Sequence, residues 1–159
     1  MKAWSLGLAV LCSIGAPLSA EQSWDHYRDT VHGCSLEYPA SVFRREPLDV
    51  SQDAQRFSSA DQSTSFRVLG FQNEKELTSA DIKAKYFAAS VPGSVVYDQR
   101  KSNFWVASGF RGPNIFYMKV ALSPDRRTAC VLEIVYPRSK KTAFDHIVTR
   151  MSRSFGARP

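Results

Sequence analysis

Hydrophobic and polar residues alternate in short runs along most of this chain, and a period of two is typical of β-strands with one buried face. Turn-forming segments such as 60–63 and 123–126 separate neighbouring runs by only a few residues. Connections this short favour antiparallel pairing, and the last four runs predict a meander. Residues 43–54 are polar, contain Pro47 and show no period, so they are predicted to form a loop. The predicted strands are residues 24–29, 34–38, 55–58, 64–71, 95–101, 104–110, 115–122 and 128–136.

Two segments repeat their apolar residues at the spacing of an α-helix. The first is predicted to begin after Thr78, which can cap it, and to end near Ser90, before Pro92-Gly93. The second follows Ser139, which is also a candidate cap. Each helix is predicted to pack its apolar stripe on the sheet. The stripes are Ile82, Tyr86 and Ala89 in the first helix, and Phe144, Ile147, Val148, Met151 and Phe155 in the second.

The strand runs 104–107 and 115–118 are apolar on both faces, which suits a sheet that is covered on each side. The fold class that accommodates all these segments is α+β, with one antiparallel β-sheet flanked by helices on both faces. Residues 21–159 have a common size for one globular domain and suffice for one substantial core. We therefore predict a single α+β domain over this range.

The first 20 residues have the layout of a secretory signal peptide. Lys2 precedes an uncharged stretch whose most apolar part is residues 6–11, and this apolar run is interrupted too early for a membrane span. Small residues at its end place the predicted cleavage before Glu21, so the mature chain is predicted to be periplasmic or secreted. Lipid attachment at Cys12 is the alternative, which the bulky Leu11 before it disfavours.

Removal of residues 1–20 leaves two cysteines, Cys34 and Cys130. Cys34 shares one face of its predicted strand with Leu36, and Cys130 shares one face with Leu132, opposite Glu133. Both sulfur atoms are therefore predicted to point into the core. In an oxidising compartment, two such cysteines are most simply a structural disulfide. A catalytic thiol would need an exposed thiolate beside a cation or a helix N-terminus, and neither position fits that description.

Residue types that usually bind metals or carry catalysis show no recognised spacing here. His26, His32 and His146 lack the carboxylate or thiolate neighbours that would complete a metal site. The chain has no Gly-x-Ser-x-Gly elbow, and its eight glycines are dispersed, without a phosphate-binding or dinucleotide-binding loop. The sequence therefore predicts no metal, no cofactor and no catalytic residue.

Two surfaces are candidates for contact with a ligand or partner. The first joins the basic loop at 111–114 to a nearby aromatic residue, and the second is the polar side of the last helix. Each has a plain structural alternative, namely core aromatics beside polar strand ends and a solvated helix face. The net charge of +6 is compatible with an anionic ligand, while export makes nucleic acid an unnatural one. The candidate residues are Trp105, Arg111 and Asn114 for the first surface, and His146, Arg150 and Arg153 for the second.

Short motifs are spread over nearly all of the predicted mature chain. They are Tyr27, Gly33, Tyr38-Pro39 and Phe43, then Arg56 to Ser59 with Asp61, Phe66 to Val68 with Gly70, Ser108-Gly109, Phe116 to Lys119, and Tyr136-Pro137 with Ser154-Phe155. With these motifs the chain resembles uncharacterised exported proteins of proteobacteria that are expected to adopt the Mog/PsbP type of α/β/α sandwich. The resemblance implies this fold and an envelope location, and it supplies no catalytic residues. Related folds mainly serve as binding or assembly modules.

The sequence thus favours a monomeric, non-catalytic binding or adaptor domain in the periplasm or the medium, without a transmembrane segment in the mature chain. Its expected partner is an envelope protein, a glycan or an anionic ligand, and the sequence does not select among them. Two alternatives remain open. One is a hydrolase-type enzyme whose site is assembled from scattered residues, and the other is a secreted effector directed at a host.

Overall fold

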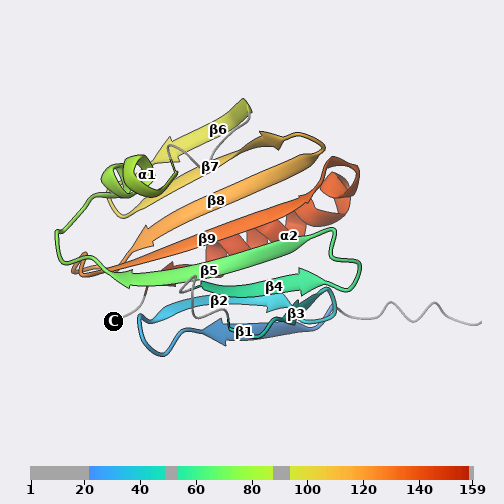
Figure 1. Ribbon diagram of the computed structural model, residues 1–159, viewed down its shortest axis with the longest axis horizontal. Coiled ribbons are helices and arrows are strands. Elements are labelled where there is room, and N and C mark those ends of the chain that lie inside the picture. The colour runs from blue at the N-terminus through green and yellow to red at the C-terminus, as the bar shows by residue number, and fades with distance from the viewer. Residues whose placement is uncertain (1–21, 49–53, 88–93, 158–159) are drawn as a thin grey trace, which may run out of the picture.

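The computed structural model describes residues 22–48, 54–87 and 94–157, which fold into two antiparallel β-sheets and two α-helices. The large sheet has the strand order β3-β4-β5-β9-β8-β7-β6, and the small sheet has the order β1-β2-β10 (Figure 1). The strands are β1 (Trp24–Arg28), β2 (Cys34–Pro39), β3 (Phe43–Arg45), β4 (Ala54–Ser59), β5 (Ser65–Gln72), β6 (Ser94–Arg100), β7 (Phe104–Arg111), β8 (Asn114–Leu122), β9 (Thr128–Pro137) and β10 (Gly156–Ala157). The helices are α1 (Ser79–Phe87), the 3₁₀ turn η1 (Arg138–Lys140) and α2 (Lys141–Ser154).

The two faces of the large sheet arise from alternation along its central strands. On β8, Ile115 and Ala121 belong to one hydrophobic cluster, whereas Phe116, Met118 and Val120 belong to another. Successive side chains of a strand point to opposite faces, so the two clusters lie on opposite sides of the sheet. The strands β6 to β9 form the predicted antiparallel meander, and β5 pairs with β9.

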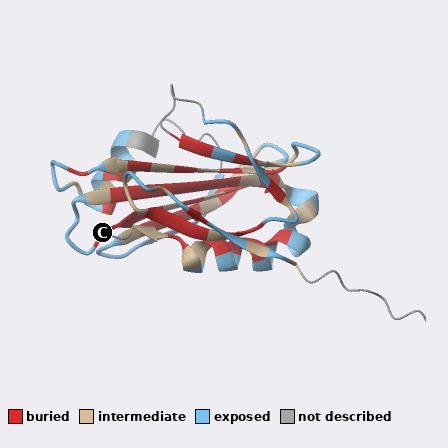
Figure 2. Cartoon of the chain, turned by 90° about the horizontal axis from the view of Figure 1, so that it is seen from below, coloured by how far each residue is buried: buried red, intermediate tan, exposed pale blue. Residues whose placement is uncertain are grey.

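The helix α2 and the small sheet pack on the face that carries the first cluster. The helix contacts β2, β8 and β9, and it buries Phe144, Ile147, Val148 and Met151 of the predicted stripe. Figure 2 shows these buried positions of α2 turned toward the strands and its exposed positions turned away. The apolar stripe of α2 therefore fixes which side of the helix remains accessible to a ligand.

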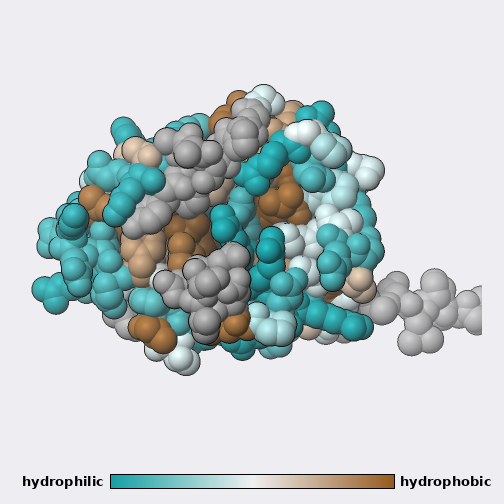
Figure 3. Space-filling view, in the orientation of Figure 1, coloured by the Kyte–Doolittle hydropathy of each residue, from teal (hydrophilic) through white to brown (hydrophobic). Residues whose placement is uncertain are grey.

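The helix α1 packs near β7 and β8 and begins at the predicted cap. The backbone N–H of Asp81 donates to Oγ1 of Thr78 at 3.3 Å, and the N–H of Thr78 donates to the Asp81 carboxylate at 2.8 Å, which is a reciprocal capping box. Ile82 is fully buried in the second cluster, next to Trp105. The predicted end of this helix lies outside the described residues. Figure 3 shows this face of the molecule, where apolar patches reach the surface between hydrophilic side chains.

Residues 43–54 were predicted to form a loop, and this is wrong at their start. Phe43–Arg45 form β3, which pairs with β4 and buries Phe43 against Phe66, with ring centroids 4.8 Å apart. A strand of three residues is too short to show a period, so only the tertiary contact reveals it.

The first two predicted strands, residues 24–29 and 34–38, belong to a separate sheet. Its strands β1 and β2 pair with each other, and the short β10 adds to β2 through Gly156 opposite Ser35. The predicted cap at Ser139 is also wrong. This residue lies in η1, and α2 begins after Lys140, without a side-chain hydrogen bond at its cap.

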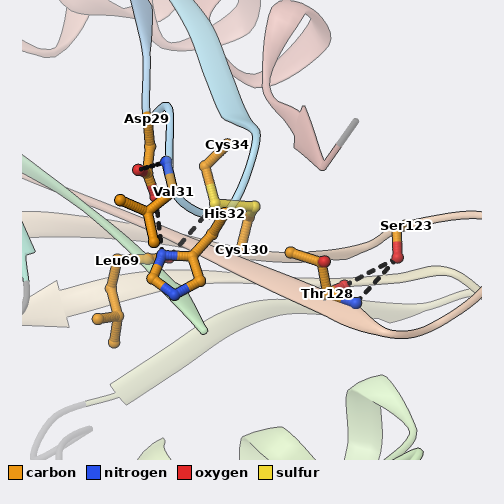
Figure 4. The surroundings of a disulfide bond; sticks show 8 residues. All are labelled: Asp29, Val31, His32, Cys34, Leu69, Ser123, Thr128 and Cys130. Carbon is orange, nitrogen blue, oxygen red and sulfur yellow. Dashed lines mark hydrogen bonds and ion pairs between the residues drawn. A yellow bond between two sulfur atoms is a disulfide. The ribbon is translucent and has the colours of Figure 1, made fainter. Parts of the chain in front are cut away.

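The predicted disulfide between Cys34 and Cys130 is present and joins the small sheet to the large one. Both residues are fully buried, as the alternation of their strands predicts. Figure 4 shows the bridge and its surroundings. Gly70 lies opposite Cys130 on the neighbouring strand β5. A Cβ atom at Gly70 would lie 2.7 Å from Sγ of Cys34, closer than real Cβ contacts, so the absence of a side chain at this position makes room for the bridge.

The predicted α+β class with a mostly antiparallel sheet is confirmed, and the described residues include two α-helices. The strands dominate the structure. The small sheet shares one face of the large sheet with α2, and α1 has nine residues and packs near β7 and β8. A sandwich with helices flanking both faces is therefore a finer description than this arrangement supports.

Candidate functional site

Three adjoining hollows follow α2. The outer hollow, of about 770 Å³, lies between α2 and Glu37 of β2. The other two, of about 340 and 270 Å³, lie between α2 and the strands β6 to β9, and we call them together the inner groove. Thr149 lines all three hollows, and Tyr117 and Val148 line both parts of the inner groove. The hollows therefore meet around a single turn of α2.

The outer hollow is lined by all three basic residues of the predicted helix surface, His146, Arg150 and Arg153. Their spacing along α2 places them on its exposed side, opposite the buried stripe. Nε2 of His146 lies 3.2 Å from the side-chain oxygen of Gln22. The structure thus brings these residues together as the helical period predicts. Whether they bind a ligand stays a prediction.

The two arginines of this hollow differ in how they are held. A guanidinium nitrogen of Arg150 lies 2.8 Å from the carboxylate of Glu37, and its guanidinium lies over the ring of Trp24 at 4.2 Å from the centroid. Arg153 is exposed and forms no ion pair with any residue that the structure describes. Arg153 lines both the outer hollow and the inner groove, so its charge is accessible from either side.

Lys119 of β8 lines the same part of the inner groove as Arg153. Its ammonium group donates to the carbonyl oxygens of Ser152 at 2.6 Å and of Phe155 at 3.1 Å, and the hydroxyl of Tyr117 is hydrogen-bonded to Oγ of Ser152. The last carbonyl groups of a helix lack partners within the helix and carry partial negative charge. Lys119 therefore stabilises the end of α2 while its ammonium group also lines the groove.

Burial shifts the pKa values of both polar groups at this end. Desolvation lowers the pKa of Lys119. Desolvation also raises the pKa of Tyr117, and the hydrogen bond between Tyr117 and Ser152 opposes that shift. Perturbed titratable groups in a hollow are a general mark of functional sites, although structural contacts such as a helix cap perturb them as well.

The other end of the inner groove is mainly apolar. Phe110 and Ile115 lie on one side, and Val148 of α2 lies on the other. The ion pair between Lys141 and Asp145, with 2.6 Å between nitrogen and oxygen, lies at the same end. The groove therefore changes character along its length, from cationic at Lys119 to apolar at Phe110.

The strand β6 forms an edge of the large sheet and one side of the inner groove. All seven of its residues are exposed, including Val95, Val96 and Tyr97 with exposed fractions of 46, 67 and 47%. The register with β7 shifts between Val95 and Tyr97, so Val96 is the extra residue of a β-bulge. Val96 and Tyr97 line the groove and place accessible apolar surface beside it.

The structure does not bring the other predicted surface together. Trp105 is only 1% exposed, and its indole N–H donates to Asp98 at 2.7 Å, so it cannot form a contact surface without unpacking. Arg111 is half-buried and donates to the carboxylate of Glu133 at 3.2 Å. Asn114 lies across the hairpin from Arg111. At the usual rise per residue, Arg111 lies about 20 Å along β7 from Trp105. Sequence order alone suggested a proximity that an extended strand does not allow.

The residues that line the inner groove, above all Lys119 and Tyr117, were not predicted from the sequence. One signal was present, since Lys119 is the lone charged residue in the apolar strand run 115–122, on the same face as Ile115 and Tyr117. A lysine on the inward face of a strand needs a partner, and this indicates a polar feature of the layer above it. The identity of that partner, the end of α2, is not visible in the sequence.

Histidine and acidic residues form no further site in the described part of the chain. Nδ1 of His32 lies 3.0 Å from a carboxylate oxygen of Asp29 beside the disulfide (Figure 4). No group of three histidine, cysteine or acidic residues that could hold a metal ion occurs among the described residues. None of the helices in residues 22–48, 54–87 and 94–157 is long and apolar enough to span a bilayer.

Solved structures share this fold. No protein-family model and no curated protein sequence matches the chain. The PsbP protein of the cyanobacterium Synechocystis sp. PCC 6803 aligns with a TM-score of 0.63 and 11% identity, over 90% of this chain and 97% of its own. The Ran-binding protein Mog1p of Saccharomyces cerevisiae aligns with a TM-score of 0.55 and 8% identity, over 85% of this chain and 95% of its own. Identities this low show a common fold and nothing about ligands.

The fold expected from the short sequence motifs, that of PsbP and Mog1p, is therefore confirmed at the level of overall structure. The resemblance to exported proteobacterial proteins stays a prediction, as does the envelope location that it implies.

Proposed function

We propose that this protein is an exported, non-catalytic binding or adaptor domain that holds its ligand in the inner groove along α2. The observation that carries the proposal is the groove itself, in which apolar side chains and a few polar groups converge from one helix and four strands. A concave, largely apolar site with few polar groups is the usual form of a binding pocket.

The similar structures support a binding role by analogy of fold. Mog1p is a Ran-binding protein, so this fold can serve protein recognition. An envelope protein, a glycan or an anionic ligand are the partner classes compatible with the exposed arginines of α2 and the mixed lining of the groove. The protein is proposed to act as a monomer, since the groove is complete within one chain.

Export is supported by the layout of residues 1–20 and by the buried disulfide. A structural disulfide forms and persists in an oxidising compartment. We propose that residues 1–20 are a removable signal peptide and that residues 21–159 act in the periplasm or the medium. Fractionation of cells followed by intact-mass analysis tests this. A mature chain that starts at Glu21 and lies outside the cytosol is expected, and an uncut chain among cytosolic proteins would contradict export.

The binding role is tested by affinity capture with a groove variant and a matched control. Thr149→Trp introduces a large ring where the three hollows meet, on an exposed position of α2. Thr142→Trp makes the same change at an exposed position of α2 that lines none of these hollows. Each tagged protein is incubated with envelope extract, and the retained proteins, glycans and lipids are identified by mass spectrometry.

The expected result is a ligand that the wild-type protein and the Thr142→Trp variant retain and that the Thr149→Trp variant loses. Equal retention by both variants would place binding elsewhere and contradict the groove. An enzymatic role is distinguished by a hydrolase screen, in which activity that disappears on one polar substitution without loss of folding would overturn the binding proposal.

A further inference from the structure

We propose that the ligand of the inner groove is a small amphiphile with a carboxylate head, whose head lies between Lys119 and Arg153 and whose aliphatic chain extends toward Phe110. This inference rests on the proposed function and adds the chemistry of the ligand. Two features of the groove support it, a cationic end without a carboxylate and an apolar end beyond it.

The cationic end contains two positive charges and no acidic side chain in its lining. Neither Lys119 nor Arg153 forms an ion pair with a residue in the described part of the chain. By contrast, Arg150 is paired with Glu37 and Lys141 with Asp145, so the nearby cations of α2 are already neutralised. The uncompensated charge is therefore concentrated at the end of the groove where it faces the hollow.

Lys119 is the stronger of the two determinants because it is half-buried. Its ammonium group has three N–H donors, of which two are directed to the carbonyl oxygens of Ser152 and Phe155. Its nitrogen also lies 5.7 Å from the ring centroid of Phe104, which lines the same hollow. A partly desolvated ammonium with one donor left gains more from an anion than a solvated one does.

Arg153 supplies the second half of the head-group site from α2. A guanidinium group presents its N–H donors in a planar fork that matches a carboxylate. The hydroxyl of Tyr97, which donates to the side-chain oxygen of Gln99 at 2.6 Å, closes this end from β6. The head-group site is thus built from β6, β8 and α2 together.

The remainder of the groove suits an aliphatic chain. Beyond Tyr117 the lining includes Val96, Phe110, Ile115 and Val148, and no unpaired acidic or basic side chain in the described residues. The two parts, of about 340 and 270 Å³, together fall within the range of about 300–1,000 Å³ that is typical of small-molecule sites. Methylene groups buried there strengthen binding through the hydrophobic effect.

Calorimetric titration of the purified protein with three probes of equal chain length separates the contribution of the head-group charge to affinity from that of the aliphatic chain. The probes are dodecanoate, 1-dodecanol and dodecyltrimethylammonium, each kept below its aggregation threshold. Dodecanoate is expected to bind at least about tenfold more tightly than the neutral alcohol, because a hydrogen bond to a charged group changes the dissociation constant by more than about tenfold. The cationic probe is expected not to bind measurably.

Variants locate the head group. Arg153→Gln is expected to weaken dodecanoate binding by about tenfold and leave 1-dodecanol unchanged. Arg28→Gln removes an exposed arginine on β1 that lines none of the hollows, and it is expected to change neither affinity. Lys119→Met keeps the aliphatic stem and removes the charge, and circular dichroism checks that this variant remains folded.

Equal binding of dodecanoate and 1-dodecanol, or unchanged dodecanoate binding in both Arg153→Gln and Lys119→Met, would overturn the inference. So would binding of an acidic peptide in the groove with no binding of dodecanoate. In each case the comparison of Thr149→Trp with Thr142→Trp still decides whether the groove binds a ligand. The proposal of a carboxylate amphiphile can therefore be wrong while the proposal of binding in the groove holds.

Discussion

Cys34 of β2 and Cys130 of β9 form a disulfide that fastens the three-stranded sheet to the seven-stranded one, with 5.7 Å between their Cα atoms. The bridge joins positions 96 residues apart, and both cysteines are fully buried. It therefore holds together two layers that pair through no strand-to-strand ladder, and these layers form the face against which α2 packs.

Loss of this bridge is expected to destabilise the protein strongly. The chain-entropy account gives about 4–5 kcal/mol for a closed loop of roughly this length. The double substitution Cys34→Ser with Cys130→Ser should lower the unfolding free energy by about this amount in a denaturant titration, with the oxidised wild-type protein as reference. Wild-type protein treated with reductant under denaturing conditions and refolded should match the variant. An unchanged unfolding midpoint would show that the bridge does not form in the native protein.

The buried carboxylate of Glu133 is expected to be a second determinant of stability. It accepts a hydrogen bond from Arg67 at 2.6 Å and two from Arg111 at 3.2 Å, across strands β5, β9 and β7. Glu133→Gln leaves two neighbouring guanidinium groups without their anion, which should lower stability by about 2–3 kcal/mol. Asp145→Asn is the control, because its pair with Lys141 is exposed and such pairs contribute about 0–1 kcal/mol. Urea midpoints that fall equally in both variants would contradict this assignment.

Stability is expected to fall in acid in part through Asp61. The hydrogen bond from Lys140 at 2.7 Å, followed by those from Ser59 and Ser63, holds the pKa of Asp61 well below its ordinary value of 3.8. A carboxyl group with a lowered folded-state pKa stabilises the native state above pH 3.8, and this contribution is lost as the pH falls through the folded-state value. The difference in stability between wild type and Asp61→Asn should therefore be largest near neutral pH and shrink below pH 3.8.

Thermal unfolding measured across the acid range checks this expectation. Lys140→Met removes the main partner of Asp61 and should reproduce most of the Asp61→Asn profile, whereas the double variant should add little. Parallel profiles of wild type and Asp61→Asn throughout the acid range would exclude a role for this carboxylate.

The attachment of β6, one side of the inner groove, is expected to depend on Gly109. A Cβ atom at Gly109 would overlap the carbonyl oxygen of Ser94 and lie 2.9 Å from Cα of Val95. Gly109→Ala should therefore displace the start of β6 and destabilise the protein by about 1–3 kcal/mol. Gly156→Ala is the matched control, since no atom lies within 4 Å of its Cβ position, and its effect should stay within about 0.5 kcal/mol.

Hydrogen exchange resolved by residue distinguishes this local effect from global unfolding. Amides of Ser94–Arg100 should exchange faster in Gly109→Ala than in the wild type, with amides of β9 less affected. Uniform acceleration over both strands, or none, would contradict a specific role of Gly109 in holding β6.

Local patterns explain why much of the fold was predictable. The runs at 104–110 and 128–136 have the length of strands, are mostly apolar and are bounded by turn residues, and these features mark β7 and β9. The helical spacing of Phe144, Ile147 and Met151 marks α2. The direction of Cys34 and Cys130 followed from strand parity, because the side-chain period of a strand is two. These features depend on residues a few positions apart in the chain, so the local sequence pattern is enough to predict them.

Long-range pairing explains what was missed. The strands β3 and β10 have only three and two residues, and they form by pairing with β4 and β2. Trp105 is buried because it packs in the same cluster as Ile82 of α1 and because its indole N–H donates to Asp98. The candidate site likewise combines a local pattern, which was predictable, with a long-range contact, which was not. The helical period placed His146, Arg150 and Arg153 on one surface, but the inner groove depends on Lys119 meeting the end of α2, a contact across more than 30 residues.

Periodicity within single segments specifies the identity and order of most elements, the inward direction of both cysteines and the basic side of α2. Contacts between distant segments divide the ten strands of the described residues into two sheets, which the disulfide joins, and they place α2 so that a groove remains between it and β6 to β9. Hydrophobic burial is non-directional, so a pattern specifies which side of an element is covered without specifying what covers it.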